Sequence, residues 1–243
     1  EVAAQAFDRY DFLAMPVCDM EERLVGIITV DDAMDVLQEE NTEDIQKMAA
    51  IVPTDTPYLK TNVVKTWKKR IPWLMLLMVS ATFSGIIITS FEDKLAAAVV
   101  LTSFIPMLMD TGGNSGGQAS VTIIRALSLN EIDFKDIFKV IWKEIRVGVF
   151  CGLSLAAVNF IKMFVIDYWI IGNHAITVSV ATVISLTLVI EIIFAKVIGC
   201  SLPMVAKKIG FDPAVMASPF ITTLVDAISL LVYFQFASLL LKI

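Results

Sequence analysis

The chain has 243 residues, of which 57% are hydrophobic, and its formal net charge is −6. Its mean hydropathy of +0.76 is too high for an ordinary soluble domain and indicates a polytopic membrane protein. No basic face is present outside the apolar runs, which argues against nucleic-acid binding. Cys18, Cys151 and Cys200 show no metal-ligand spacing, so we expect lone buried thiols.

The first 50 residues are predicted to form a small α/β unit. The chain opens on Glu1, without a visible signal peptide and with the pattern of a domain interior, so we expect a piece of a longer protein. The β-branched runs Phe12–Asp19 and Arg23–Val30 flank acidic turn residues and predict a hairpin. The periodicity of Val30–Ala50 then predicts a helix.

A linker and a basic helix follow, in residues 51–71. Val52–Pro57 contains helix-breaking residues, and Tyr58–Arg70 has the pattern of an amphipathic helix at a membrane surface. Its basic residues at the expected headgroup level are Lys65, Lys68, Lys69 and Arg70.

The remainder of the chain, residues 72–243, contains five apolar segments. Crossing a bilayer takes about 20 helical residues. We predict spans near 72–91, 95–127, 146–170, 175–206 and 213–241. Basic residues gather before the first span, after the second and after the fourth, whereas the opposite side has only Lys94 and Lys242. This bias predicts a cytosolic N-terminus and an extracytoplasmic C-terminus.

Asp226 is the most informative of the ionisable residues within the predicted spans. It lies about 13 residues into the fifth span, roughly 20 Å from its start, with no basic residue within one helical turn. A charged group at that depth costs about 2.5–3.5 kcal/mol. The carboxyl group is either protonated or paired with a neighbouring helix, or it faces a hydrated pathway and binds a cation. We favour the pathway.

Three further acidic residues have two interpretations each. Asp212 precedes Pro213, as in a helix N-cap, and would also place negative charge at the inner mouth of a pore. Asp110 serves either the ion path or the capping of a chain break. Glu191 forms either an internal ion pair with Lys196 or a proton-sensitive site.

The stretch "PMLMDTGGNSGGQ" (residues 106–118) has four glycines close to polar side chains. Such bare backbone either exposes carbonyls to a permeating ion or lets helices approach closely. Pro219 is expected to free the carbonyl of Val215 inside the fifth span, near the Thr222 and Thr223 hydroxyls. Oxygen-only ligands favour Mg²⁺ or Ca²⁺, and a two-fold dimer would bring two Asp226 carboxylates to one axis.

Residues 106–118, followed by "IIRALSL", resemble the signature of the MgtE family of magnesium channels, which is related to the SLC41 carriers. Phe211–Leu230 resembles the fifth span of that family. Met15–Ala50 resembles the end of its second CBS domain and its plug helix. The resemblance implies an all-α polytopic homodimer, with five transmembrane helices per subunit and a CBS remnant at residues 1–50.

The resemblance also implies residue roles. The pore would lie on the dimer axis, lined by the second and fifth spans, with hydrated Mg²⁺ at Asp226. The implied metal-site residues are Asp226, Thr222, Asp212, Gly112, Gly113, Asn114 and Ser218. The implied regulatory residues, which would bind cytosolic Mg²⁺ and close the pore, are Asp35, Glu40, Glu43 and Asp44. The alternative for the second group is a solvated acidic helix face.

The predicted function is uptake of Mg²⁺ through a regulated, Mg²⁺-selective channel or transporter in the plasma membrane. Thr29 and Asp32 have the spacing with which CBS modules hold a ribose, so ATP is a further candidate ligand of an intact CBS domain. One alternative is a divalent cation exchanger coupled to Na⁺ or H⁺, and another is a membrane-anchored CBS nucleotide sensor. No accessible nucleophile and base occur together, so we expect no enzyme.

Overall fold

The computed structural model describes residues 2–54, 56–97, 99–216 and 218–241 and is mostly helical. The chain divides into two compact parts. One comprises Glu1–Lys47 and Ile51–Lys69, and the other comprises Met48–Ala50 and Arg70–Ile243. The positions of the two parts relative to each other are not determined, and each is described by itself.

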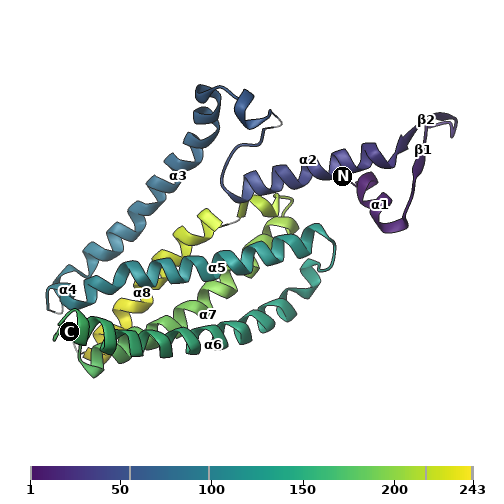
Figure 1. Cartoon of the computed structure of the whole chain (residues 1–243). Helices are drawn as coiled ribbons and strands as arrows, with labels where there is room; N and C mark the ends of the chain where they lie inside the picture. The colour runs from purple at the N-terminus through teal and green to yellow at the C-terminus, as the bar shows by residue number, and fades with distance from the viewer. Residues whose placement is uncertain (1, 55, 98, 217, 242–243) are drawn as a thin grey trace. The chain divides into compact units, whose positions relative to one another are not determined.

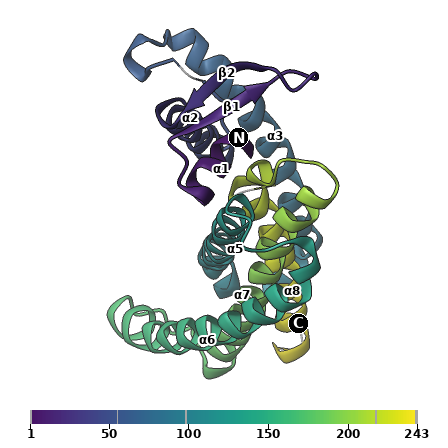
Figure 2. The same cartoon turned by 90° about the vertical axis from the view of Figure 1, so that its right-hand side faces the viewer.

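The N-terminal part contains the predicted hairpin and the predicted helix. Its elements are α1 (Val2–Tyr10), β1 (Ala14–Cys18), β2 (Leu24–Thr29), α2 (Val30–Met48) and the 3-10 helix η1 (Tyr58–Lys60). The two strands lie side by side (Figure 2). They are antiparallel, and Ala14 is opposite Thr29. A small core from α1 and α2, made of Ala4, Phe7 and Ala33, packs against side chains of both strands.

The cysteine prediction is wrong for one residue. Cys200 is buried and Cys151 is partly buried, but Cys18 is exposed. Cys18 ends β1, and a hairpin of only two strands leaves most of its surface to solvent. All three thiols are free.

The basic helix and the first predicted span form one helix, α3 (Val63–Ser90), which continues through Pro72. It is the least covered of the long apolar helices. Only 6% of its most apolar 18-residue window is buried inside the protomer, against 50% for the corresponding window of Val178–Lys208. Within one protomer, α3 therefore leaves a long apolar surface for lipid or for another protein chain.

The second predicted span, residues 95–127, is not one helix. The segment contains α4 (Glu92–Ala97), the 3-10 helix η2 (Val99–Phe104) and α5 (Ile105–Ser128). Pro106 explains the start of α5, because proline is favoured in the first turn of a helix. The glycine-rich stretch lies inside α5 and causes no chain break there.

The last three predicted spans are present with shifted bounds. After the 3-10 helix η3 (Phe134–Asp136), α6 (Ile137–Lys162) begins earlier than expected and continues as a π-helix, Met163–Ile170. It is followed by α7 (Val178–Lys208), the 3-10 helix η5 (Pro213–Met216) and α8 (Ser218–Leu241). Figure 1 shows α5, α6, α7 and α8 alongside one another.

Within the described ranges, four helical segments are long and apolar enough to cross a membrane. They are Val63–Ser90, Phe134–Ile170, Val178–Lys208 and Pro213–Leu241. The segment that we predicted as the second span is not among them. Glycines and polar side chains occupy the middle of α5, and they lower its hydropathy.

The helices of this bundle approach one another closely at glycines. A Cβ at Gly199 of α7 would lie 2.2 Å from the carbonyl oxygen of Gly116 in α5. A Cβ at Gly152 of α6 would lie 3.0 Å from Cα of Val189 in α7. Small residues allow such backbone contact between membrane helices. The main apolar core of the bundle includes Ile184, Leu188 and Phe234.

Tyr233 also joins distant parts of the bundle. Its side chain is 0% exposed, and its hydroxyl donates a hydrogen bond to the carbonyl of Leu101, at 2.9 Å. Tyr233→Phe should lower the free energy of unfolding by about 1–3 kcal/mol, because the buried carbonyl loses its donor. Thermal unfolding in detergent measures the effect. Tyr58→Phe, at a side chain that is 78% exposed, is the control, and an equal shift in both variants would contradict this role.

Candidate functional site

Helix α5 has a polar face and a glycine face. Asp110, Asn114 and Gln118 recur every four residues and are exposed within the protomer, and we call them the polar stripe. The glycines Gly112, Gly113, Gly116 and Gly117 are buried. A helix with a polar, exposed stripe beside a tightly packed face can line a water-filled path without losing its own packing.

The glycine face packs against α8. A Cβ at Gly113 would lie 2.9 Å from Cγ2 of Thr222, and one at Gly116 would lie 2.8 Å from Cγ2 of Ile221. Of the two interpretations of this stretch, close helix packing is therefore the one that these contacts support. The packing brings Gly113 and Thr222, two of the predicted site residues, together.

Asp226 lies one helical turn beyond Thr222 and is half-buried. The Asp110 carboxylate of the polar stripe is close enough for the two negative charges to repel each other. Among the described residues, no lysine, arginine or histidine forms an ion pair with Asp226. Helices α5 and α8 thus bring two carboxylates together without a cationic side chain between them, and a cation would relieve their repulsion.

The start of α8 differs from the prediction. The helix begins at Ser218, so Pro219 lies in its first turn, where a missing N–H costs no helical hydrogen bond. Val215, whose carbonyl Pro219 is expected to leave free, belongs to the separate 3-10 helix η5 and not to α8. The Thr222 and Thr223 hydroxyls both donate to the carbonyl of Pro219, at 2.9 and 3.2 Å. The side chain of Ser218 lies outside the described part of the structure.

Asp212 begins a helix, as its position before Pro213 predicted. Its Oδ1 accepts a hydrogen bond from the N–H of Ala214 at 2.8 Å, at the start of η5. The rest of η5 and the first two turns of α8 separate it from Asp226. The structure therefore does not place Asp212 beside Asp226.

Glu191 and Lys196 form no ion pair among the described residues, although both lie in α7 and are 1% and 5% exposed. Glu191 instead lies against α5, where a Cβ at Gly112 would be 2.1 Å from its Oε1. Gly112 is thus close to Glu191, whereas Asn114 is exposed. Sequence reasoning missed both this contact and that of Gly199, because a single glycine or acid in an apolar run does not identify its partner helix.

The described residues contain no group of three or more His, Cys, Asp or Glu side chains that could hold a metal ion. One protomer therefore offers Asp226 and Asp110 as two neighbouring carboxylates rather than as a closed set of metal ligands. This arrangement suits a cation that keeps most of its water.

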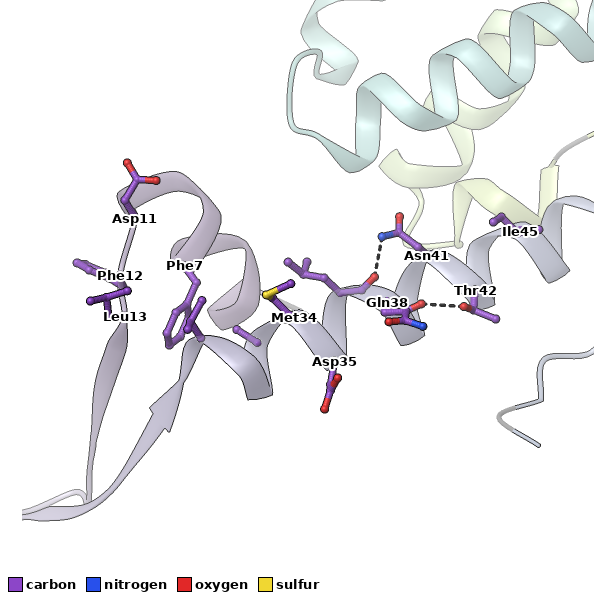
Figure 3. A pocket seen from close by; sticks show the side chains of 13 residues that line it. Phe7, Asp11, Phe12, Leu13, Met34, Asp35, Gln38, Asn41, Thr42 and Ile45 are labelled. Carbon is purple, nitrogen blue, oxygen red and sulfur yellow. Dashed lines mark hydrogen bonds between the residues drawn. The ribbon is translucent and has the colours of Figure 1, made fainter. Parts of the chain in front are cut away.

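The predicted regulatory acids all lie on one helix, α2. Glu43 forms an ion pair with Lys47, at 2.5 Å, and Glu40 is half-buried. Asp35 is exposed and lines an open pocket of about 810 Å³ (Figure 3). The pocket is bounded on its other side by apolar residues, including Phe7 and Phe12.

Thr29 and Asp32, the predicted ribose-binding pair, bind each other. The Thr29 hydroxyl and amide donate to Oδ2 of Asp32 at 2.6 and 3.1 Å. These two bonds, chiefly that from the hydroxyl, hold the pKa of the Asp32 carboxyl below its usual value. Helix α2 begins at Val30, the residue after Thr29, and Asp32 lies in its first turn. The two bonds therefore cap the N-terminus of this helix.

Comparison with known protein families identifies this bundle. Residues 105–236, from the start of α5 almost to the end of α8, match the MgtE family, described as divalent cation transporters. The chain belongs to the MgtE family. It is thus a member of a transporter family and not an enzyme, and the match includes the polar stripe, the glycine face and Asp226.

Three relatives of this MgtE chain are named magnesium transporter MgtE. Those of Thermus thermophilus and Bacillus subtilis are each 38% identical over 242 residues, covering 100% and 98% of the chain. That of Enterococcus faecalis is 34% identical over 242 residues and covers 100% of the chain. The chain spans about half the length of these relatives, namely 52%, 51% and 51%.

Proposed function

We propose that this protein transports Mg²⁺ across a membrane. The observation that carries the proposal is the half-buried Asp226, held in the middle of α8 beside Asp110 and without a cationic partner among the described residues. The site offers only oxygen ligands, which Mg²⁺ prefers. The names of the three relatives support this choice of ion.

Two protomers complete the path in this proposal. The polar stripe of α5 is exposed in the protomer, and α3 leaves most of its apolar surface uncovered. A two-fold dimer that faces the stripes toward each other would bring two Asp226 carboxylates to one axis. Mg²⁺ sheds water reluctantly, and two carboxylates across a wet path can hold it hydrated.

The proposed arrangement has five spans, because α5 crosses with its polar stripe toward the path. Residues 1–50 form a CBS remnant with the plug helix, residues 51–71 the linker and juxtamembrane helix, and residues 72–243 the transmembrane domain. The distribution of basic residues supports a cytosolic N-terminus and a C-terminus outside the plasma membrane.

Uptake of Mg²⁺ into proteoliposomes containing the purified chain tests this function. We expect uptake that is independent of imposed Na⁺ or H⁺ gradients, together with unitary currents in planar bilayers. Uptake that stops without such a gradient would favour the coupled exchanger. A chain without residues 1–50 that still transports would exclude a pure nucleotide sensor.

Cytosolic Mg²⁺ is proposed to close the path through the acids of α2. Glu40, Glu43 and Asp44 lie within about one turn of one another on this helix, so a bound dication would relieve their mutual repulsion. Nucleotide binding at Thr29 and Asp32 would require their mutual hydrogen bonds to open.

Replacing both Glu43 and Asp44 by their amides should weaken inhibition by Mg²⁺ on the cytosolic side. Removing two charges lowers the affinity of the acidic face for a dication, and we expect about a tenfold higher inhibitory concentration. The inhibition curve in patches or oriented vesicles measures it. The matched control is Glu21→Gln with Glu22→Gln in the hairpin turn, and identical curves for all three proteins would contradict the assignment.

A further inference from the structure

Glu191 is a buried acid without a cationic partner among the described residues. Its side chain is 1% exposed, and neither Oε1 nor Oε2 has a hydrogen-bond partner in the described part of the chain. Leaving a carboxylate in this condition is costly, because neither water nor a cationic side chain compensates its charge.

Three helices enclose this carboxyl group. On α5, Gly112 leaves the space that the carboxyl group fills, since a Cβ there would be 2.1 Å from Oε1 and 3.0 Å from Cδ. On α8, the Ser229 hydroxyl lies one turn beyond Asp226, is 1% exposed and lies close to the Glu191 carboxyl group, without forming a hydrogen bond of good geometry. Two buried polar groups from α7 and α8 thus lie next to each other.

The charges around Glu191 are mainly negative. Asp226 of α8 is close enough to repel it, and Asp110 of α5 is in turn close to Asp226. In the part of the chain that the structure describes, the one buried base of α7 is Lys196, and it forms no ion pair. Among the described residues, the negative charges near Glu191 are therefore not neutralised by a cationic side chain.

We propose that Glu191 is a further acidic group of the cation site and acts from inside the protomer on the dication held at Asp226. The inference rests on the proposed function. Glu191 does not touch the ion in this arrangement, so it is a positioning residue. The protein interior screens the negative charge of Glu191 poorly, so the electrostatic attraction reaches the ion. This attraction is stronger for a divalent than for a monovalent ion. The dication in turn supplies the positive charge that Glu191 lacks.

The test is the Mg²⁺ dependence of uptake by Glu191→Gln, which removes the charge and keeps the shape against Gly112. We expect the half-saturating Mg²⁺ concentration to rise about tenfold, with a smaller change in maximal rate and a lower preference for Mg²⁺ over K⁺. Glu191→Asp retains the charge and should recover most of the affinity. A purely structural role would give the opposite order, because glutamine preserves the packing better than aspartate does.

Gly112→Ala provides a second, independent measurement. The added methyl must displace the Glu191 carboxyl group, so the variant should also raise the half-saturating concentration. In a Glu191→Ala background the same change should have a much smaller effect, because the closest clashing group is absent and only the contact with Cγ1 of Val225, at 3.0 Å, remains. Additive effects of the two substitutions would show that the contact does not act on the site.

Glu131→Gln, in the exposed loop after α5, controls for a lost charge and should behave as the wild type. Asp226→Asn separates the two proposals. If Asp226→Asn loses uptake and Glu191→Gln keeps the wild-type affinity for Mg²⁺, only the role of Glu191 is refuted. Absence of Mg²⁺ uptake by the wild type, or full uptake by Asp226→Asn, refutes the proposed function itself.

Discussion

Asp226→Ala is expected to lower Mg²⁺ uptake at least about 100-fold while leaving the dimer assembled. The residue supplies the charge that compensates a dication in the middle of α8, and among the described residues no ion pair neutralises it. In a two-fold dimer each substitution removes two such charges. A loss of about 3 kcal/mol of ion stabilisation corresponds to this factor of 100.

Uptake into proteoliposomes at matched protein density measures the effect, and size-exclusion chromatography of the same preparation reports assembly. Asp226→Asn should lose uptake as well, because the charge rather than the shape is needed. Asp136→Asn is the control, since Asp136 lies at the start of α6 and pairs with Lys139 at 2.8 Å. Undiminished uptake by either variant at Asp226 would overturn the assignment.

Gly199→Ala should destabilise the bundle by about 3 kcal/mol or more. The new Cβ would lie 2.2 Å from the carbonyl oxygen of Gly116 and 2.9 Å from its carbonyl carbon. Both are backbone atoms of a packed helix, so the overlap cannot be relieved by rotating a side chain, and α5 and α7 must move apart. The variant should unfold at a lower temperature and retain little folded protein in detergent.

Gly85→Ala is the matched control. Gly85 lies inside α3, and a Cβ there meets no atom within 4 Å in the protomer. Alanine is also favoured over glycine inside helices by about 1 kcal/mol, so this variant should be as stable as the wild type or more stable. Equal unfolding temperatures for the two alanine variants would contradict the close crossing of α5 and α7.

The local sequence pattern predicted most of the secondary structure. The alternating runs around Val17 and Ile27 predicted the hairpin, and Asp212 with Pro213 predicted a helix start. Each of these features depends on neighbouring residues, whose spacing is visible in the chain. The isolated Asp226 was also noticeable from sequence, because an acid is rare in an apolar run.

Partners from distant parts of the chain could not be predicted in the same way. Nothing in the sequence around Gly112 indicates that the acid opposite it is Glu191, or that Gly116 meets Gly199. These contacts depend on the rotation and crossing of α5, α7 and α8. The glycine-rich sequence of residues 106–118 was likewise compatible with a broken helix or a continuous one. In the structure it is part of the continuous helix α5, which packs against α7 and α8.

The composition of α5 has a consequence for synthesis. In the five-span arrangement that we propose, α5 must cross the bilayer. Its glycines and polar stripe make its own insertion into lipid only weakly favourable. The surfaces that cover it belong to α7 and α8, which leave the ribosome later. We therefore expect nascent chains that end before α7 to hold α5 only loosely in the membrane, and the full bundle to secure it after translation has passed α8.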